Sequence, residues 1–411
     1  MCMTDNSCIQ SKKGDNMDKI GVYQLAGDIN RTDPMLVACC QNYLGRLGRA
    51  LDAELRPVEE DVFREQGLPV FFLASGGIAG TFRDVCRCVE GPYILLTTSG
   101  WNSLPASMEI LAYLHEQGMQ GEILHGEPEE VAPRLELLLR LAKARRALRR
   151  MRLGVIGETL SLAASRADGL QLQQRFGAQM EMLEVQALID EYRRGGCPEN
   201  AFTRELRQSG YDPAELEKAL NVYGAVRRMV ETHRLDAVTV RCFDLLGAIG
   251  TTGCLALAIL NAEGIPAGCE GDTRSLLSMA VLHVLTGEPV FMANPSRLDR
   301  QRSEMVFAHC TLPMNMPRGY RLTTHFESGI GVALAADFDA GPVTVFKCDE
   351  TGRFQVQDGE LVESLHLPDL CRTQLRIRLP EGVEGFLTNP IANHQMICKG
   401  HWAELIRAFF A

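Results

Sequence analysis

The sequence contains no long hydrophobic run. None of its 411 residues falls in a stretch approaching the roughly 18 uninterrupted apolar residues that a membrane-spanning helix requires. The first 20 residues mix Lys, Asp, Asn and Ser and lack the apolar segment of a secretory signal. We therefore expect no membrane partner and a cytoplasmic location.

An excess of positive charge and a disulfide framework are also missing. The formal net charge is −10, from 42 basic and 52 acidic residues, which argues against nucleic acid as the main partner. Fourteen cysteines follow no framework spacing, and the tight pairs Cys39-Cys40 and Cys86-x-Cys88 have no second pair at zinc-site distance. We expect reduced thiols rather than disulfides or a structural zinc site.

No internal repeat or low-complexity tract interrupts the chain. Its length and its hydrophobic content of 46% predict two or three packed domains. The pattern changes character along the chain, so we expect a flexible N-terminus over 1–18, an α/β domain over 19–150, a second α/β domain over 151–313 and a C-terminal β domain over 314–411.

Short apolar strands alternate with amphipathic helices in the first of these domains. A strand–helix–strand rhythm implies a parallel sheet with helices on its faces. The strand at 70–73 runs into a glycine loop at 75–80 that lacks a P-loop lysine and departs from the dinucleotide fingerprint. We interpret the loop as a tight turn rather than a nucleotide site, and the basic end of a helix at 129–150 as a solvated helix terminus rather than a nucleic-acid patch.

The second half of the chain changes from helical to strand periodicity. A strand at 237–240, a buried helix at about 252–263 and a helix from 273 to 286 are expected, the last capped by Asp272 and ended by Gly287. After about 313 the apolar residues alternate with polar ones, which indicates antiparallel strands. The predicted fold is two Rossmann-like parallel-sheet domains followed by an antiparallel β-barrel-like domain.

Glu270 is the most informative single residue. It follows Cys269 at the end of an apolar strand, where a carboxylate is costly unless it has a partner. Because Asp272 takes the capping position, Glu270 is left for another task. Asp244 and Asn294 also follow expected strands, and the carboxyl ends of parallel strands gather at one edge of a sheet. We therefore expect an oxygen-rich site around Glu270.

Three histidines fall in or beside the β domain, at His309, His325 and His394. A single histidine in such a place is more often a hydrogen-bonding core residue than a ligand. His325 and Glu327, two apart on an expected strand, would point to one face and support the site. An oxygen-rich site with one imidazole suits Mn²⁺, Mg²⁺ or another hard divalent cation.

These residues carry a family resemblance. The segment Cys269-Glu270-Gly271-Asp272, the helix ending in Leu285-Thr286-Gly287 and the strand at 291–294 resemble the L-fucose and L-arabinose isomerase superfamily, best its shorter fucose-isomerase-like branch. The similarity is strongest over about 235–300 and weaker, but ordered, from there to the end. It implies a divalent-metal-dependent aldose–ketose isomerase that converts a monosaccharide through a cis-enediol. It also implies a homo-oligomer, a hexamer in the family, with active sites near the subunit interfaces.

The resemblance also assigns roles. By motif position, Glu270, Asn294 and His394 would hold the metal, usually Mn²⁺, and we expect Glu270 to be the principal base. Asp272 or Asp244 is expected to compensate for the carboxylate that is missing at position 294. Asn294 stands where the family has aspartate, so it would be a neutral ligand that cannot act as a base. Residues expected to contact the sugar are Asp244, His325, Glu327, Arg372 and Asn393, and Arg31 is expected to reach the sugar of a neighbouring subunit. No organic cofactor is expected.

Two alternatives stay open. A sulfosugar isomerase of the sulfoquinovose type would need a cation near the sugar, for which Arg31, Arg241 and Arg372 are candidates. A non-catalytic sugar-binding or regulatory protein would account for Asn294 in place of the family aspartate.

Overall fold

The structure, a computed structural model, describes residues 18–157 and 165–411. It divides into two compact units, 1–143 and 144–411, which we describe separately. The expected flexible N-terminus, apart from Asp18, lies outside the described residues. No helix within the described ranges is long and apolar enough to cross a membrane.

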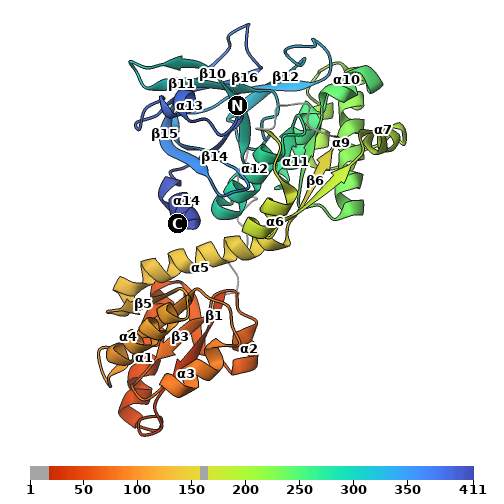
Figure 1. Ribbon diagram of the computed structural model, residues 1–411. Coiled ribbons are helices and arrows are strands. Elements are labelled where there is room, and N and C mark those ends of the chain that lie inside the picture. The colour runs from red at the N-terminus through yellow and green to blue at the C-terminus, as the bar shows by residue number, and fades with distance from the viewer. Residues whose placement is uncertain (1–17, 158–164) are drawn as a thin grey trace, which may run out of the picture. The chain divides into compact units, whose positions relative to one another are not determined.

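The first unit is built on a parallel five-stranded sheet in the order β2-β1-β3-β4-β5 (Figure 1). Its strands are β1 (Asp18–Leu25), β2 (Ala53–Pro57), β3 (Val70–Leu73), β4 (Tyr93–Thr97) and β5 (Gly121–His125), and its helices are α1 (Pro34–Ala50), α2 (Glu60–Arg64), α3 (Ala79–Cys86), α4 (Ser103–Glu116) and α5 (Pro128–Arg150), whose last turns enter the second unit. Phe71 and Phe72 are fully buried in separate hydrophobic clusters. Successive strand residues point to opposite faces, so both faces of the sheet are covered, as expected for a parallel sheet.

The second unit begins with a four-stranded parallel sheet in the order β7-β6-β8-β9. Its strands are β6 (Arg152–Ile156), β7 (Gln179–Leu183), β8 (Ala237–Val240) and β9 (Ala267–Cys269), and its helices are α6 (Gly169–Phe176), α7 (Val185–Arg193), α8 (Ala201–Arg207), α9 (Pro213–His233), α10 (Phe243–Ile249), α11 (Cys254–Ala262) and α12 (Thr273–Thr286). Helix α11 is buried on every side, as its all-round apolar sequence predicts.

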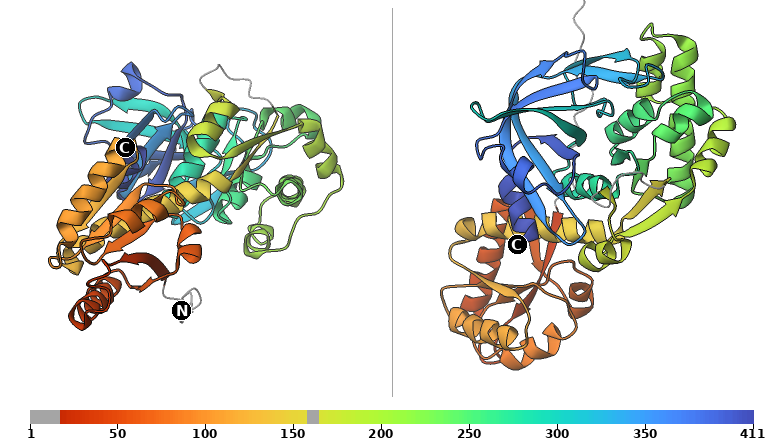
Figure 2. Two further views of the ribbon diagram at one scale, coloured as in Figure 1. Left: turned by 60° about the horizontal axis from the view of Figure 1, so that its bottom comes forward. Right: turned by 45° about the horizontal axis from the view of Figure 1, so that its top comes forward.

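A closed six-stranded antiparallel barrel in the order β10-β11-β16-β15-β14-β17 completes this unit (Figure 2). Its strands are β10 (Phe291–Asp299), β11 (Glu304–His309), β14 (Gly341–Cys348), β15 (Phe354–Leu365), β16 (Thr373–Arg378) and β17 (Gln395–Lys399); the remaining elements are the hairpin β12 (Gly319–Thr323) and β13 (Ala333–Asp337), α13 (Gly385–Thr388) and α14 (Ala403–Phe410). The predicted fold class, two parallel sheets and a barrel, is confirmed.

One strand has other partners than expected. The sequence places β10 in the second parallel sheet, whereas it pairs antiparallel with β11 and β17 inside the barrel. The barrel therefore takes two strands from before residue 314, where we expect the β domain to begin. The three-domain division itself stays a prediction, since the contacts separate only the units 1–143 and 144–411.

Helix α12 joins the two layers of the second unit. It contacts β8 and β9 of the sheet and β14 and β17 of the barrel, and Figures 1 and 2 show it between them. The helix begins at Asp272, which caps it, and ends at Gly287 in the left-handed conformation, both as predicted. Its N-terminus therefore lies where sheet and barrel meet.

A close backbone approach at Gly224, inside α9, allows a stability test. A glycine-to-alanine change in a helix usually stabilises by about 1 kcal/mol. Here an added Cβ would press against the carbonyl oxygen of Gly196 and lie 2.8 Å from the Cα of Cys197. We expect Gly224→Ala to lower the free energy of unfolding by about 1–3 kcal/mol, measured by urea denaturation.

Gly247 in α10 is the matched control, because an added Cβ meets nothing within 4 Å there. Gly247→Ala should raise the free energy of unfolding by about 0.5–1 kcal/mol. Equal stabilisation by both changes would show that α9 and the loop at 196–197 are not packed as described.

Candidate metal and sugar site

The backbone turns sharply where β9 ends. Glu270 and Gly271 both adopt left-handed conformations, with φ of 63° and 65°. The N–H of Gly271 donates to the carbonyl of Val240 at 3.3 Å, and that of Asp272 to the carbonyl of Cys269 at 3.2 Å. A left-handed glutamate costs roughly 1–2 kcal/mol, and such strain concentrates at functional sites. The turn separates the Glu270 side chain from the helix that follows.

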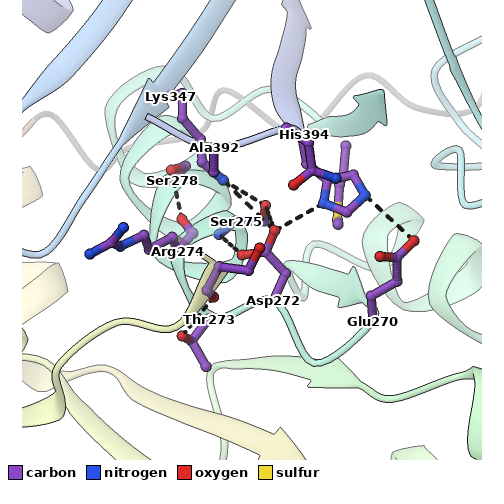
Figure 3. A network of polar contacts seen from close by, with 12 residues as sticks. Glu270, Asp272, Thr273, Arg274, Ser275, Ser278, Lys347, Ala392 and His394 are labelled. Carbon is purple, nitrogen blue, oxygen red and sulfur yellow. Dashed lines mark hydrogen bonds and ion pairs between the residues drawn. The ribbon is translucent and has the colours of Figure 1, made fainter. Parts of the chain in front are cut away.

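Asp272 is held from two sides (Figure 3). Its Oδ1 accepts the Ser275 N–H at 2.8 Å and its Oδ2 accepts the Ser275 hydroxyl at 2.6 Å, so it caps α12. The same Oδ2 lies 2.9 Å from Nδ1 of His394, the residue before β17. Both side chains are 1% exposed, so this contact between helix and barrel is shielded from solvent.

The second ring nitrogen of His394 faces Glu270. His394 Nε2 lies 3.6 Å from Glu270 Oε1 and is buried without a hydrogen-bond partner among the described residues. His309, the last residue of β11, packs edge-on against the His394 ring with centroids 5.4 Å apart. Its Nδ1 lies 2.9 Å from the Thr311 hydroxyl. Each imidazole thus has one nitrogen fixed by a neighbour, as is typical of metal-ligating histidines.

Glu270, His309 and His394 form a candidate metal site. One potential ligand atom from each lies within 4.8 Å of the other two. Barrel register brings the histidines together: Asn294 of β10 pairs with Ala308, beside His309, and Ala293 pairs with Gln395, beside His394. One carboxylate and two imidazoles, with one buried ring nitrogen that has no partner in residues 18–157 and 165–411, fit a divalent cation.

The electrostatics of the site are consistent with this donor set. Burial and, to a smaller extent, the neighbouring His394 together lower the pKa of His309 to about 3, so this imidazole is neutral. Burial raises the pKa of Glu270, but the positive charge of a protonated His394, 3.6 Å away, outweighs it, and the net pKa lies below its ordinary value. Burial lowers the pKa of His394, but Asp272 and Glu270 outweigh it and raise that pKa above its ordinary value. Burial likewise opposes a low pKa for Asp272, yet Lys347 and His394 hold it well below its usual range. A neutral imidazole and a carboxylate are the forms that bind metal.

A pocket opens beside these residues. Its lining consists of Cys242, Phe243, Leu246, Thr252, Cys254, Cys269, Glu270, Asn294, His309, Cys310, His325, Glu327 and Cys371. The cysteines in this lining are free thiols. Asn294 therefore reaches the site predicted for it, but from a barrel strand rather than from the edge of the parallel sheet. Its Oδ1 accepts a hydrogen bond from Asn393 Nδ2 at 3.1 Å.

Among the predicted sugar contacts of this unit, Asp244, Arg372 and Asn393 do not line the pocket. Asp244 forms an ion pair with Arg241 at 3.0 Å, and neither lines the pocket. Arg372 donates to the Thr324 carbonyl at 2.9 Å and stacks on the Phe326 ring, 5.5 Å from its centroid. Arg31 belongs to the first unit, where it is exposed and 3.4 Å from Asp28.

His325 and Glu327 line the pocket from a turn, not from the expected strand. The alternation Thr324-His325-Phe326-Glu327 suits a strand, but Gly329 and Gly331 follow in left-handed conformations that end the extended chain. His325 Nδ1 lies 3.0 Å from the Ser328 hydroxyl, which closes the turn.

Two residues of the site are not assigned from sequence. His309 is interpreted from the sequence as a hydrogen-bonding core residue. Thr311, two positions later, contacts its Nδ1 and leaves Nε2 available as a ligand. Lys347 goes unnoticed, although a lysine within the apolar run Val343-Thr344-Val345-Phe346-Lys347-Cys348 is the signal of a buried charge that needs a partner.

The fold and site together define an α/β protein with a carboxylate–imidazole cluster where sheet and barrel meet. The chain is 28% identical over 234 residues to a sulfoquinovose isomerase of Clostridium sp. (strain MSTE9), covering 54% of this chain and 51% of that protein. It is 29% identical over 173 residues to an L-arabinose isomerase of Nocardioides sp. (strain ATCC BAA-499 / JS614), covering 39% and 34%. These similarities support membership of the fucose/arabinose isomerase superfamily, in agreement with the resemblance of its motifs.

The chain spans about half of the length of the first relative and about a third of the second. No protein-family model matches it. Among solved structures, D-threo-3-hydroxyaspartate dehydratase from Delftia sp. HT23 shares 12% identity over 82% of this chain and 73% of its own, with a TM-score of 0.14, which is too low to indicate a common fold.

The cluster predicts specific metal binding. We expect the wild type to bind Mn²⁺ and expect His309→Gln and His394→Gln each to weaken the affinity at least tenfold, because each removes a nitrogen ligand. Isothermal titration of metal-stripped protein measures this. His401→Gln, at a half-exposed histidine on the barrel, is the matched control and should leave the affinity unchanged. Equal affinity in all four proteins would exclude this site.

Proposed function

We propose that the protein is a divalent-metal-dependent aldose–ketose isomerase that converts a monosaccharide through a cis-enediol(ate). The observation that carries the proposal is the cluster of Glu270, His309 and His394 beside a pocket, with His394 Nε2 buried and without a hydrogen-bond partner in the described chain. Both relatives carry names of sugar isomerases, which supports the same reaction class. A homo-oligomeric assembly and a cytoplasmic location stay predictions.

The metal is held by Glu270, His309 and His394 in this proposal, with Asn294 as a further neutral ligand and Mn²⁺ as the first candidate ion. A divalent cation there supplies Lewis acidity to the sugar oxygens at C1 and C2, which makes the adjacent C–H more acidic. The second imidazole, His309, extends the expected donor set, and nitrogen ligands widen the choice of ion toward Zn²⁺ and other transition metals.

In this proposal, carboxylates of the chain carry out the proton transfer. The reaction moves one proton between C1 and C2, so it needs a base that accepts the proton and returns it to the neighbouring carbon. Glu270 is the principal candidate, and Glu327 is the other carboxylate that lines the pocket. Asp272 is fully buried, with both oxygens engaged by Ser275 and His394, so we assign it to positioning rather than to proton transfer.

The lining of the pocket favours an uncharged sugar. Among the described residues, no arginine or lysine lines it. A sulfonate in a pocket needs a cation to offset its desolvation. Arg241 and Arg372, the candidates for that role within the unit, engage Asp244 and Thr324 instead. The observation supports a neutral aldose over the sulfosugar alternative.

Paired substitutions distinguish the roles of the carboxylates of Glu270 and Glu327. Glu270→Gln should lower kcat at least about a hundredfold, because an amide cannot carry the proton, and should also weaken Mn²⁺ binding. Glu327→Gln should lower kcat while leaving Mn²⁺ affinity unchanged, since Glu327 is outside the metal cluster. Steady-state kinetics and metal titration are the measurements, with Glu288→Gln in the loop after α12 as control. Full activity of Glu270→Gln contradicts the mechanism.

Deuterium exchange distinguishes an enzyme from a binding protein. An isomerase incorporates solvent deuterium at C2 of its sugar, which NMR detects, whereas a non-catalytic sugar-binding protein gains thermal stability from the sugar without exchange. We expect exchange with members of a panel of neutral pentoses and deoxyhexoses, and slower exchange with sulfoquinovose. Exchange with sulfoquinovose alone would overturn the assignment of a neutral substrate.

A further inference from the structure

Lys347, on β14, is the most deeply buried charge beside the site. Its side chain is fully buried, a position that lysine almost never occupies without a partner. Its Nζ donates a hydrogen bond to Ser275 Oγ at 2.7 Å and lies 3.9 Å from Asp272 Oδ2. Figure 3 shows Lys347 and His394 converging on Asp272 from different sides.

The chemistry of these groups determines which atom donates and which accepts in each hydrogen bond. An ammonium only donates and a carboxylate only accepts. The Ser275 hydroxyl therefore accepts from Lys347 and turns its own hydrogen to Asp272 Oδ2, 2.6 Å away. His394 Nδ1, 2.9 Å from the same oxygen, must likewise donate. A neutral His394 with its hydrogen on Nδ1 presents the lone pair of Nε2 toward Glu270, the orientation that a ligand needs.

The buried carboxylate also needs compensating charge. Among the described residues, Lys347 is the cationic side chain within ion-pair distance of Asp272 when His394 is neutral; His394 adds a second positive charge there only when it is protonated. Arg274, the nearest alternative on α12, is directed to Glu350, to which it donates at 2.6 and 2.8 Å. An uncompensated buried carboxylate costs several kcal/mol, so Lys347 stabilises the one residue that orients His394.

We propose that Lys347 is a positioning residue that sets the ring tautomer of His394 through Ser275 and Asp272 and so prepares Nε2 as a metal ligand. The metal-binding part of this proposal rests on the proposed function, whereas the tautomer is a property of the metal-free protein. Lys347 touches neither the pocket nor the metal cluster, and its influence passes along three hydrogen bonds.

The tautomer is measured directly, without substrate. ¹⁵N–¹H correlation spectra of metal-stripped wild type, at a pH where His394 is neutral, should show its hydrogen on Nδ1. A hydrogen on Nε2 in the wild type overturns the proposal without any variant. Lys347→Met keeps the volume of the side chain and removes the ammonium. We expect it to populate the Nε2–H tautomer of His394 and to weaken Mn²⁺ binding tenfold to hundredfold.

Two further variants separate this role from a general loss of stability. Arg274→Met removes another largely buried cation from the same region, so it should lower the melting temperature while leaving the tautomer and Mn²⁺ affinity unchanged. Ser275→Ala removes the hydroxyl that links Lys347 to Asp272 and should shift the tautomer in the same direction as Lys347→Met. It provides the test if Lys347→Met does not fold.

An Nδ1–H tautomer and Mn²⁺ affinity within twofold of wild type in folded Lys347→Met or Ser275→Ala overturn the proposal. Lack of isomerase activity in the wild type, with the tautomer shift intact, would contradict the proposed function alone.

Discussion

The hydrogen bond between Asp272 and His394 is the contact on which the second unit depends. It joins residues 122 positions apart, one at the N-terminus of α12 and the other at the start of the barrel strand β17. Both side chains are almost fully buried, so loss of either leaves the other without its partner in a place that water does not reach. The contact therefore constrains how the barrel meets the α/β layer. It also holds the candidate metal site together, because Glu270 follows a strand of the sheet, whereas both histidines come from the barrel.

Local signals in the sequence account for much of this architecture. Neighbouring residues in the sequence are enough to predict the cap at Asp272, the end of the helix at Gly287 and the burial of helix α11 on all sides. The alternation of apolar and polar residues after 313 likewise predicts antiparallel strands. Strand pairing is different, because it depends on residues far apart in the chain. The apolar run at 290–293 suits a central parallel strand and a barrel strand equally well, and its partners β11 and β17 decide between them. For that reason the sequence assigns β10 to the wrong sheet, and it predicts where the strand begins but not that it continues to Asp299.

The residues of the site show the same difference between local and long-range signals. Glu270 is recognisable because a charge after an apolar strand is costly wherever the chain folds, and the left-handed backbone adds to that cost. His309 is not, because its own neighbours are those of an ordinary core residue and its meaning arises only when β11 brings it beside His394. Arg372 and Asp244 show the converse. Their charges suggest sugar contacts, yet each has another partner: Asp244 pairs with Arg241, three residues before it, and Arg372 donates to Thr324, 48 residues before it.

The charges around the cluster give Asn294 a physical meaning. Asp272 and Lys347 are opposite charges buried together, and His309 is neutral, so Glu270 carries the remaining negative charge at the cluster. On the proposed function, a divalent cation held by one carboxylate and neutral ligands keeps one positive charge, and an aspartate at position 294 would cancel it. Enediolate formation places negative charge on the sugar oxygens, which a positive site stabilises better than a neutral one. Asn294, hydrogen-bonded to Asn393, then has a role that favours catalysis, although it cannot carry a proton. On the proposed function, asparagine in place of the aspartate that the family resemblance implies leaves proton transfer to Glu270 and Glu327, while the metal and its ligands stabilise the charge that develops on the sugar.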